Sequence, residues 1–342
     1  MSEAAPPTAR RPARRHGESD AAPVGWYEFV AIVAFCVFML SVPWQQLWNG
    51  RFIDRTVYLD KFTHYLATPR VFSGSFLAFI VNEVVFEKTI LWSVATFNVG
   101  LEVVFGVISF LCLFVYSKYL TSRHGLIAMI FLINPMIVEF AFSQLRMALA
   151  VSLLMLALFH QKRRPLAIVL AALACSIHTA SFLMLFIFTA SKFVATRLAA
   201  SSFKGLHCWL ALFGVGAAVV LAIGPFRGVI LSAVGDRRAE YSNVSQSILY
   251  ASFWVLLLLM AGTQKRTYFA VEGNAVAIVF LSVYVGATVF NTYNSRFLSA
   301  SFPFIISSML GLSLQKRVLI LPVYFLYAGA QWYYWLNAGM GR

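Results

Sequence analysis

Long uninterrupted apolar runs are the feature that most constrains this chain. Leu210–Ile223 and Phe253–Gly262 contain no charged residue at all. Only 12% of the residues are charged and 60% are hydrophobic, whereas soluble domains carry about 25% and roughly 45–50%. Too little polar surface remains to cover a water-soluble globule, and the composition also excludes a disordered or collagen-like chain. Because the runs are continuous rather than alternating, they favour membrane helices over an outer-membrane barrel.

The runs predict an all-α polytopic membrane protein with about 11 transmembrane helices (range roughly 10–12) of ~20 residues each. A disordered, basic cytoplasmic tail is expected over 1–25 and a single integral-membrane domain over 26–342. The first apolar run is long enough to stay as an anchor. The expected spans are Tyr27–Leu47, Val99–Tyr116, Leu126–Phe140, Gln144–Phe159, two legs within Pro165–Ala190, Leu206–Gly224, Ile248–Gly262, Asn274–Phe290, Phe297–Leu314 and Val318–Trp335.

Two stretches do not fit a simple count of spans. Val71–Phe97 is mostly apolar but carries several polar residues, so we expect a re-entrant or interfacial helix at the outer face. Pro165–Ala190 is long for one span and short for two. A short hairpin that turns near His178 keeps the basic residues of 192–204 inside, together with the arginine-rich N-terminus, and the positive-inside rule therefore favours it.

Arginines on the outer face exceed what this rule explains. The net charge is +14, and under the expected topology 11 of the 27 basic residues lie outside, nine of them arginines. In a soluble protein such charge indicates nucleic acid, which we do not expect here. Guanidinium groups bind phosphate bidentately, and Arg146 and Arg296 each begin an inward-running span. Alternatively, these two side chains snorkel to the interface or pair with Glu139 or Asp54.

The first external loop, Trp48–Arg70, holds further candidate residues. Asp54 and Tyr58 are four residues apart and would share one face of a helix, which offers an acid and an aromatic ring to a sugar; the alternative is an ordinary solvated loop. Asp54 and Asp60 make a poor metal pair because a cation follows each acid. Phosphate-binding, zinc-protease and hydrolase motifs are absent from the sequence, so we expect no metal and no cofactor.

His178 lies in an apolar stretch and needs a partner at membrane depth. It is either a general base or phosphate ligand, since histidine titrates near neutral pH, or it makes a structural hydrogen bond. Arg146 follows Gln144 and opens a span with small residues, which allow close helix packing.

The ordered set of these motifs resembles the EpsG/Wzy-type polysaccharide polymerases of bacterial cytoplasmic membranes. The resemblance covers most of 26–337. It depends on motifs that occur in this order: Arg51, Asp54 and Tyr58; then Glu83; then Arg146-Met-Ala-Leu-Ala150; then His178-Thr-Ala-Ser181; then Arg296-Phe297.

The resemblance implies an enzyme that joins oligosaccharide repeat units carried on undecaprenyl pyrophosphate at the outer face of the membrane. It implies membrane lipid, a flippase and a chain-length regulator as partners. His178, Asp54 and Glu83 become the candidate catalytic residues. The candidate substrate-binding residues are Arg51, Tyr58, Gln144, Arg146, Arg237, Arg238, Tyr241 and Arg296.

Three alternatives remain open from the sequence. They are an O-antigen-ligase-like transferase, a lipid-linked glycan transporter or flippase, and a non-catalytic membrane partner of a glycan assembly complex. A transporter is expected to show repeated halves and charges in mid-membrane. No convincing repeat is visible and the charges gather at one face, which favours an enzyme.

Overall fold

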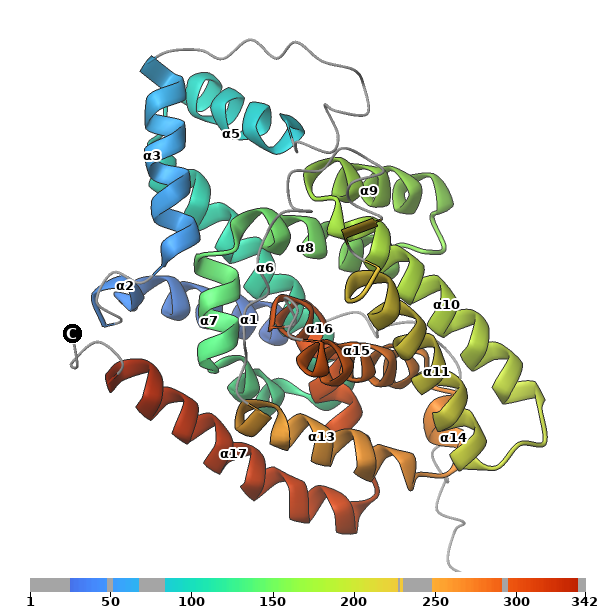
Figure 1. Cartoon of the computed structure of the whole chain (residues 1–342). Helices are drawn as coiled ribbons and strands as arrows, with labels where there is room; N and C mark the ends of the chain where they lie inside the picture. The colour runs from blue at the N-terminus through green and yellow to red at the C-terminus, as the bar shows by residue number, and fades with distance from the viewer. Residues whose placement is uncertain are drawn as a thin grey trace, which may run out of the picture.

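A computed structural model describes residues 25–47, 52–67, 84–226, 228–229, 248–290 and 295–337, and over these parts the chain is helical throughout (Figure 1). The elements are α1 (Trp26–Ser41), α2 (Trp44–Leu47), α3 (Ile53–Ala67), α5 (Val84–Phe97), α6 (Leu101–His124), the 3-10 helix η1 (Leu126–Leu132), α7 (Pro135–Phe142), α8 (Leu145–Phe159), α9 (Arg164–Ile177), α10 (Ala180–Ala200), α11 (Gly205–Ile223), α13 (Ile248–Gly262), α14 (Arg266–Phe269), α15 (Glu272–Val289), α16 (Ser295–Leu310) and α17 (Leu314–Asn337).

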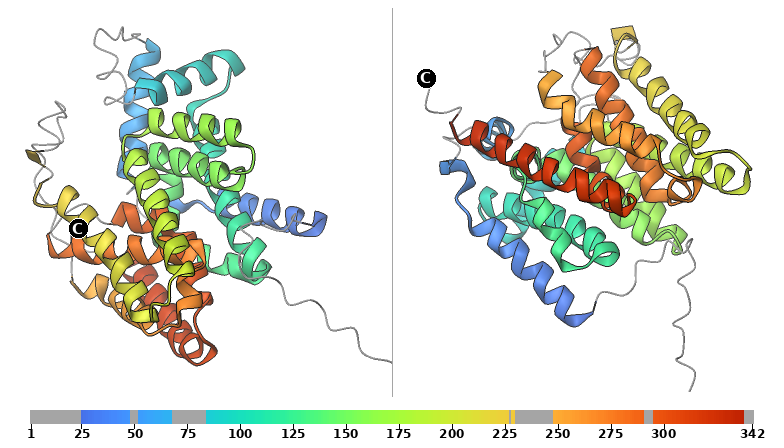
Figure 2. Two further views of the ribbon diagram at one scale, coloured as in Figure 1. Left: turned by 90° about the vertical axis from the view of Figure 1, so that its right-hand side faces the viewer. Right: turned by 90° about the horizontal axis from the view of Figure 1, so that it is seen from below.

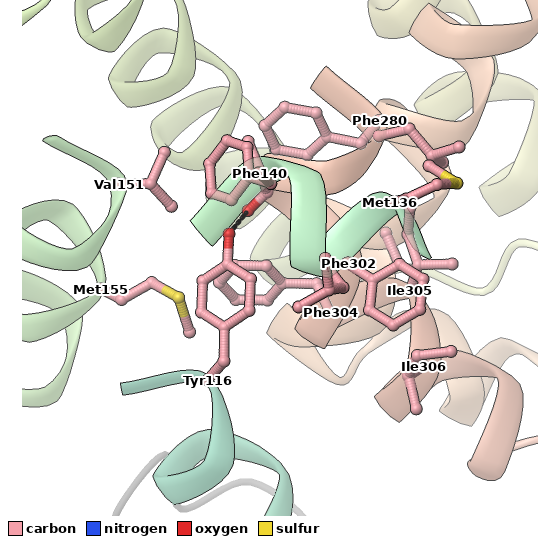
Figure 3. Close-up of a cluster of buried hydrophobic side chains, with 14 of the residues drawn as sticks. Tyr116, Met136, Phe140, Val151, Met155, Phe280, Phe302, Phe304, Ile305 and Ile306 are labelled. Carbon is pink, nitrogen blue, oxygen red and sulfur yellow. Dashed lines mark hydrogen bonds between the residues drawn. The ribbon is translucent and has the colours of Figure 1, made fainter. Parts of the chain in front are cut away.

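The largely buried helix α15 lies at the centre and packs against α10, α11, α13 and α16 (Figures 1 and 2). Gly216 of α11 lets that helix approach very closely, since a Cβ there would lie 2.5 Å from the Ser282 Cβ on α15. On the other side α6 packs against α8, α1 and α16. The hydroxyl of Tyr116 donates to the Ala300 carbonyl at 2.9 Å and ties α6 to α16 within the aromatic core (Figure 3).

The prediction of about 11 spans is wrong. Among the described residues, four helices are long and apolar enough to cross a membrane, or up to five if the bent pair α7–α8 is one span. The four are Leu101–His124, Ala180–Leu198, Gly205–Ile223 and Glu272–Val289. Several apolar runs are split into helices too short for a bilayer core of ~30 Å. Thus Tyr27–Leu47 breaks after the 16 residues of α1, and Leu126–Phe140 divides into η1 and α7.

The predicted hairpin near His178 is confirmed in one respect and wrong in another. The helix does break there, between α9 and α10. However, α9 packs along α8 far more than along α10, and α10 continues for 21 residues. Lys192 Nζ on α10 donates to Gln161 Oε1 at 2.5 Å, so this lysine lies beside the basic cluster that follows α8. The side of the membrane on which they lie stays a prediction.

The stretches before α6 also differ from expectation. The region expected as an external loop is helical over α3, and Lys61 of α3 forms an ion pair with Glu87 of α5. Within 71–97, the helix α5 is described and does not qualify as a span, while 71–83 lies outside the described residues, as does the tail 1–24. All four cysteines are free and buried.

Candidate functional site

A sharp bend between α7 and α8 forms a polar junction in an apolar core. Asn134 caps α7, since its side chain accepts a hydrogen bond from the Met136 amide at 2.9 Å, and Pro135 follows. The helix ends at Phe142, and α8 restarts at a 97° angle. Such a break leaves carbonyls at the end of one helix and amides at the start of the next without partners in the helix. Arg55 Nη1 of α3 donates to the Phe142 carbonyl oxygen at 3.3 Å.

Arg146, in the first turn of α8, is oriented by a tyrosine from α3. Its Nε donates to the Tyr58 hydroxyl at 2.7 Å, and its guanidinium carbon lies 5.5 Å from the centre of the Tyr58 ring. Tyr58 is buried and packs against the rings of Phe62 and Phe86. The tyrosine is therefore held by the core, and its polar end positions the arginine.

Arg296, in the first turn of α16, reaches the same helix α3. Its Nη2 lies 3.0 Å from Asp54 Oδ2, with 40% and 32% of the two side chains exposed. An ion pair with this much exposure contributes at most about 1 kcal/mol. An anionic ligand of higher charge therefore competes with Asp54 for Arg296 at little cost.

Glu139 and Gln144 complete the cluster at the bend. The Glu139 carboxylate interacts with the charges of Asp54 and Arg296, and the side chain of Gln144 hydrogen-bonds it. Gln144 is only 8% exposed, and its Oε1 has no hydrogen-bond partner among the described residues. A buried acceptor of this kind normally has a partner, so it offers a hydroxyl or amide donor a site to bind.

Charges in this cluster are balanced. Three arginines, Arg55, Arg146 and Arg296, meet the three acids Asp54, Glu102 and Glu139, with Arg55 ion-paired to Glu102. The arrangement is a set of forked donors held in place by carboxylates, which suits recognition of phosphate oxygens.

The sequence-predicted residues are brought together only in part. Asp54, Tyr58, Gln144, Arg146 and Arg296 meet at the bend. Their helix α3 puts Asp54 and Tyr58 on one face, as the four-residue spacing predicts. Arg51, Glu83, Arg237, Arg238 and Tyr241 lie outside the described residues.

His178 lies at the C-cap of α9 and is 8% exposed. Because α8 and α9 are of nearly equal length and are joined by only four residues, they form an antiparallel hairpin. The end of α9 therefore points toward the start of α8, where Arg146 lies.

The weak metal pair finds no support. Asp60 is exposed, six residues from Asp54 and so on a different face of α3. Within the described parts of the chain, no group of three or more His, Cys, Asp or Glu side chains could hold a metal ion.

Sequence reasoning did not assign a role in the site to Arg55, Glu102 or Glu139. Arg55 directly follows Asp54, and Glu139 was considered only as a pairing partner of an arginine. These three residues lie at helix ends that face the same side as Arg146, and this position is the signal that could have identified them.

Comparisons with known proteins do not assign this chain to a family. No protein-family model matches the chain. No curated protein and no solved structure matches it either.

Proposed function

We propose that this protein is a membrane polymerase that joins oligosaccharide repeat units carried on undecaprenyl pyrophosphate. The observation that carries the proposal is the meeting of Arg146 and Arg296, from two separate helix starts, with Asp54 and Tyr58 on α3. The proposal places the chain in a bacterial cytoplasmic membrane as a multi-pass protein with a cytoplasmic N-terminus and the cluster outside. A flippase and a chain-length regulator are its proposed partners.

The proposed reaction transfers the growing glycan from its lipid pyrophosphate to a hydroxyl of the next lipid-linked unit. The acceptor oxygen bonds to the anomeric carbon, the bond from that carbon to the pyrophosphate oxygen breaks, and undecaprenyl pyrophosphate leaves with the electron pair. Arg146 and Arg296 hold the departing pyrophosphate, where pre-positioned cations stabilise the developing charge. The hydroxyl proton goes to a base, either His178 or an acid of the cluster such as Asp54.

The test is chain growth by purified protein supplied with lipid-linked repeat units. Arg146→Ala and Arg296→Ala each remove a charge-assisted hydrogen-bond donor, which corresponds to a rate loss of roughly 10–150-fold. Arg197→Ala is the matched control, since Arg197 is exposed and stacks on Phe193 away from the cluster. Full-length polymer at normal yield from both cluster variants would refute the proposal.

A lipid-linked glycan transporter is the second candidate, and the bent pair α7–α8 favours it. Transporters bind anionic groups at discontinuous helices whose N-termini point at the substrate, and α8 begins beside Arg146. Vesicles that contain the protein separate the two functions. A polymerase lengthens glycans without moving lipid-linked units between leaflets, whereas a transporter moves single units and leaves their length unchanged.

A further inference from the structure

A polar pocket lies at the opposite end of α6 and α8 from the cluster at the bend. It is a cavity of about 40 Å³, and its polar lining comes from Tyr119, Arg123, Gln161, Glu272 and Gly273. One water-sized probe needs roughly 10–15 Å³ of such volume. The cavity therefore has room for several oxygen atoms, as many as a bound phosphate group would place in it. Arg123 is exposed, so the pocket is reached from the surface.

The pocket contains hydrogen-bond donors that a ligand can use. The Tyr119 side chain is 3% exposed, and its hydroxyl makes no hydrogen bond of standard geometry among the described residues, where the Ser307 side chain is a neighbouring donor. The guanidinium carbon of Arg123 lies 4.3 Å from the centre of the Tyr119 ring, so the arginine stacks on the face of the ring. Because Ser307 acts as a donor to the phenol oxygen, the Tyr119 hydroxyl keeps its own proton for an acceptor, and a ligand beside the guanidinium supplies one.

Gly273 allows the backbone of α15 to border the cavity. A Cβ at this position would lie 2.5 Å from the Tyr119 hydroxyl and 3.1 Å from Arg123 Nη1. Gly273 is in the first turn of an 18-residue helix, where backbone amides lack partners within the helix. These amides add to the partial positive charge of a helix N-terminus.

The acid in the lining is offset by cations. Lys192 Nζ lies 3.6 Å from Glu272 Oε2, and Lys118 stacks at 5.1 Å over the ring of Phe159, which also lines the cavity. With Arg123 added, positive charge exceeds negative charge around the pocket. A metal cation is therefore disfavoured and an anion is favoured.

We infer that this pocket binds a phosphate group, with Arg123 and the Tyr119 hydroxyl as donors. The group is either the headgroup phosphate of an anionic membrane lipid or free inorganic phosphate. This inference does not depend on the proposed function, because it concerns different residues at the opposite end of the bundle.

Calorimetric titration of the purified full-length protein tests the inference. The probes are inorganic phosphate, short-chain phosphatidylglycerol, and short-chain phosphatidylcholine as the zwitterionic control. Tyr119→Phe removes one hydroxyl and keeps the ring under Arg123, while Arg123→Gln removes the charge and Gly273→Ala fills the cavity. Each variant is expected to raise the dissociation constant about tenfold or more, as loss of a hydrogen bond to a charged group does. Arg197→Gln, at an exposed arginine outside the cavity, is expected to leave it unchanged.

The outcomes are distinct. Binding of both anionic probes, or of phosphatidylglycerol alone, supports the inference, and the second result identifies a lipid headgroup. Binding of inorganic phosphate alone supports it and identifies the free anion. If neither anion binds, if phosphatidylcholine binds equally well, or if Tyr119→Phe and Arg123→Gln both bind like the wild type, the inference is overturned. Tyr119→Phe removes from the described structure only the interaction of the hydroxyl with Ser307, so the test does not depend on the overpacked Gly273→Ala variant.

Discussion

At each end of the helix bundle an arginine packs against a tyrosine, but the two pairs differ in geometry. At the bend, Arg146 donates to the hydroxyl of Tyr58, with its guanidinium carbon 5.5 Å from the ring centre. At the basic end, the guanidinium carbon of Arg123 lies 4.3 Å from the ring centre of Tyr119, and the neighbour of that hydroxyl is the Ser307 side chain rather than the arginine.

The difference shows that neighbouring charges, rather than the residue pair, decide what such a pair can do. At the bend the carboxylates of Asp54 and Glu139 balance the arginines, and the tyrosine hydroxyl is used to fix a donor in position. At the basic end, cations exceed acids and the hydroxyl is left to a ligand. The first arrangement is pre-organised for a reacting group, and the second is suited to holding an anion.

The largest expected effect is all-or-none and tests whether the two ends face opposite sides of the membrane. Thr56→Cys on the exposed face of α3 and Ser201→Cys after α10 are placed in a background without the four native cysteines. An impermeant thiol reagent added to intact cells is expected to label position 56 and not 201. Labelling of position 201 from outside would place the basic end outside and reverse the proposed orientation.

Arginine-to-lysine changes at both ends should separate the functions of the two pairs. Lysine keeps the charge but loses the fork of donors, so Arg146→Lys is expected to slow glycan chain growth roughly 10–150-fold. Arg123→Lys is expected to leave chain growth unchanged. Equal losses in the two variants, at equal protein levels, would show that the ends are not functionally distinct.

Removing the tyrosine hydroxyls should affect stability in opposite ways. Tyr58→Phe breaks a hydrogen bond to a charged group and is expected to lower the free energy of unfolding by about 1.5–3 kcal/mol. Tyr119→Phe removes a buried hydroxyl that makes no hydrogen bond of standard geometry and has only the Ser307 side chain beside it, so the free energy of unfolding should stay nearly equal or rise. Unfolding by denaturing detergent in mixed micelles, without phosphate, measures both. A large loss in Tyr119→Phe would reveal a partner that the structure does not describe.

Alanine at two glycines gives the smallest expected effects. Nothing lies within 4 Å of a Cβ at Gly106, in the half of α6 nearer the bend, so Gly106→Ala should raise the free energy of unfolding by about 0.5–1 kcal/mol. Gly273→Ala at the basic end should lower it by at least about 1 kcal/mol, because the added methyl meets the Tyr119 hydroxyl. The same unfolding assay compares them, and a gain in both variants would argue against tight packing at Gly273.

Much of the helix layout follows from hydrophobicity along the chain. The expected span Asn274–Phe290 corresponds to α15, and Leu206–Gly224 to α11, each within about two residues, because long apolar runs without breakers leave little choice. The number of membrane spans did not follow from hydrophobicity. At the bend after Phe142, the carbonyl of the helix end accepts a hydrogen bond from Arg55, 87 residues earlier in the chain, and no local sequence pattern predicts such a contact.

The cluster at the bend was predictable where spacing or sidedness carried the information. The four-residue spacing put Asp54 and Tyr58 on one face, and charge parity put Arg146 and Arg296 at one end. Pairing of Arg296 with Asp54, weighed as an alternative from the sequence, is what the structure shows. The ion pair between Arg55 and Glu102 was not predictable, since it depends on how α6 packs beside α3. The role of His178 stays a prediction.

The 97° turn between α7 and α8 has a consequence for how a lipid-borne molecule would arrive. Two helices at nearly a right angle cannot both run along the membrane normal, so at least one of them is strongly tilted away from it. A polar headgroup that reaches Arg146 sideways leaves its hydrocarbon tail among the surrounding lipids. Withdrawal of that tail would cost about 0.8 kcal/mol per CH₂, and lateral entry avoids this cost. Under the proposed function, the tail length of the carrier would then matter little for its affinity.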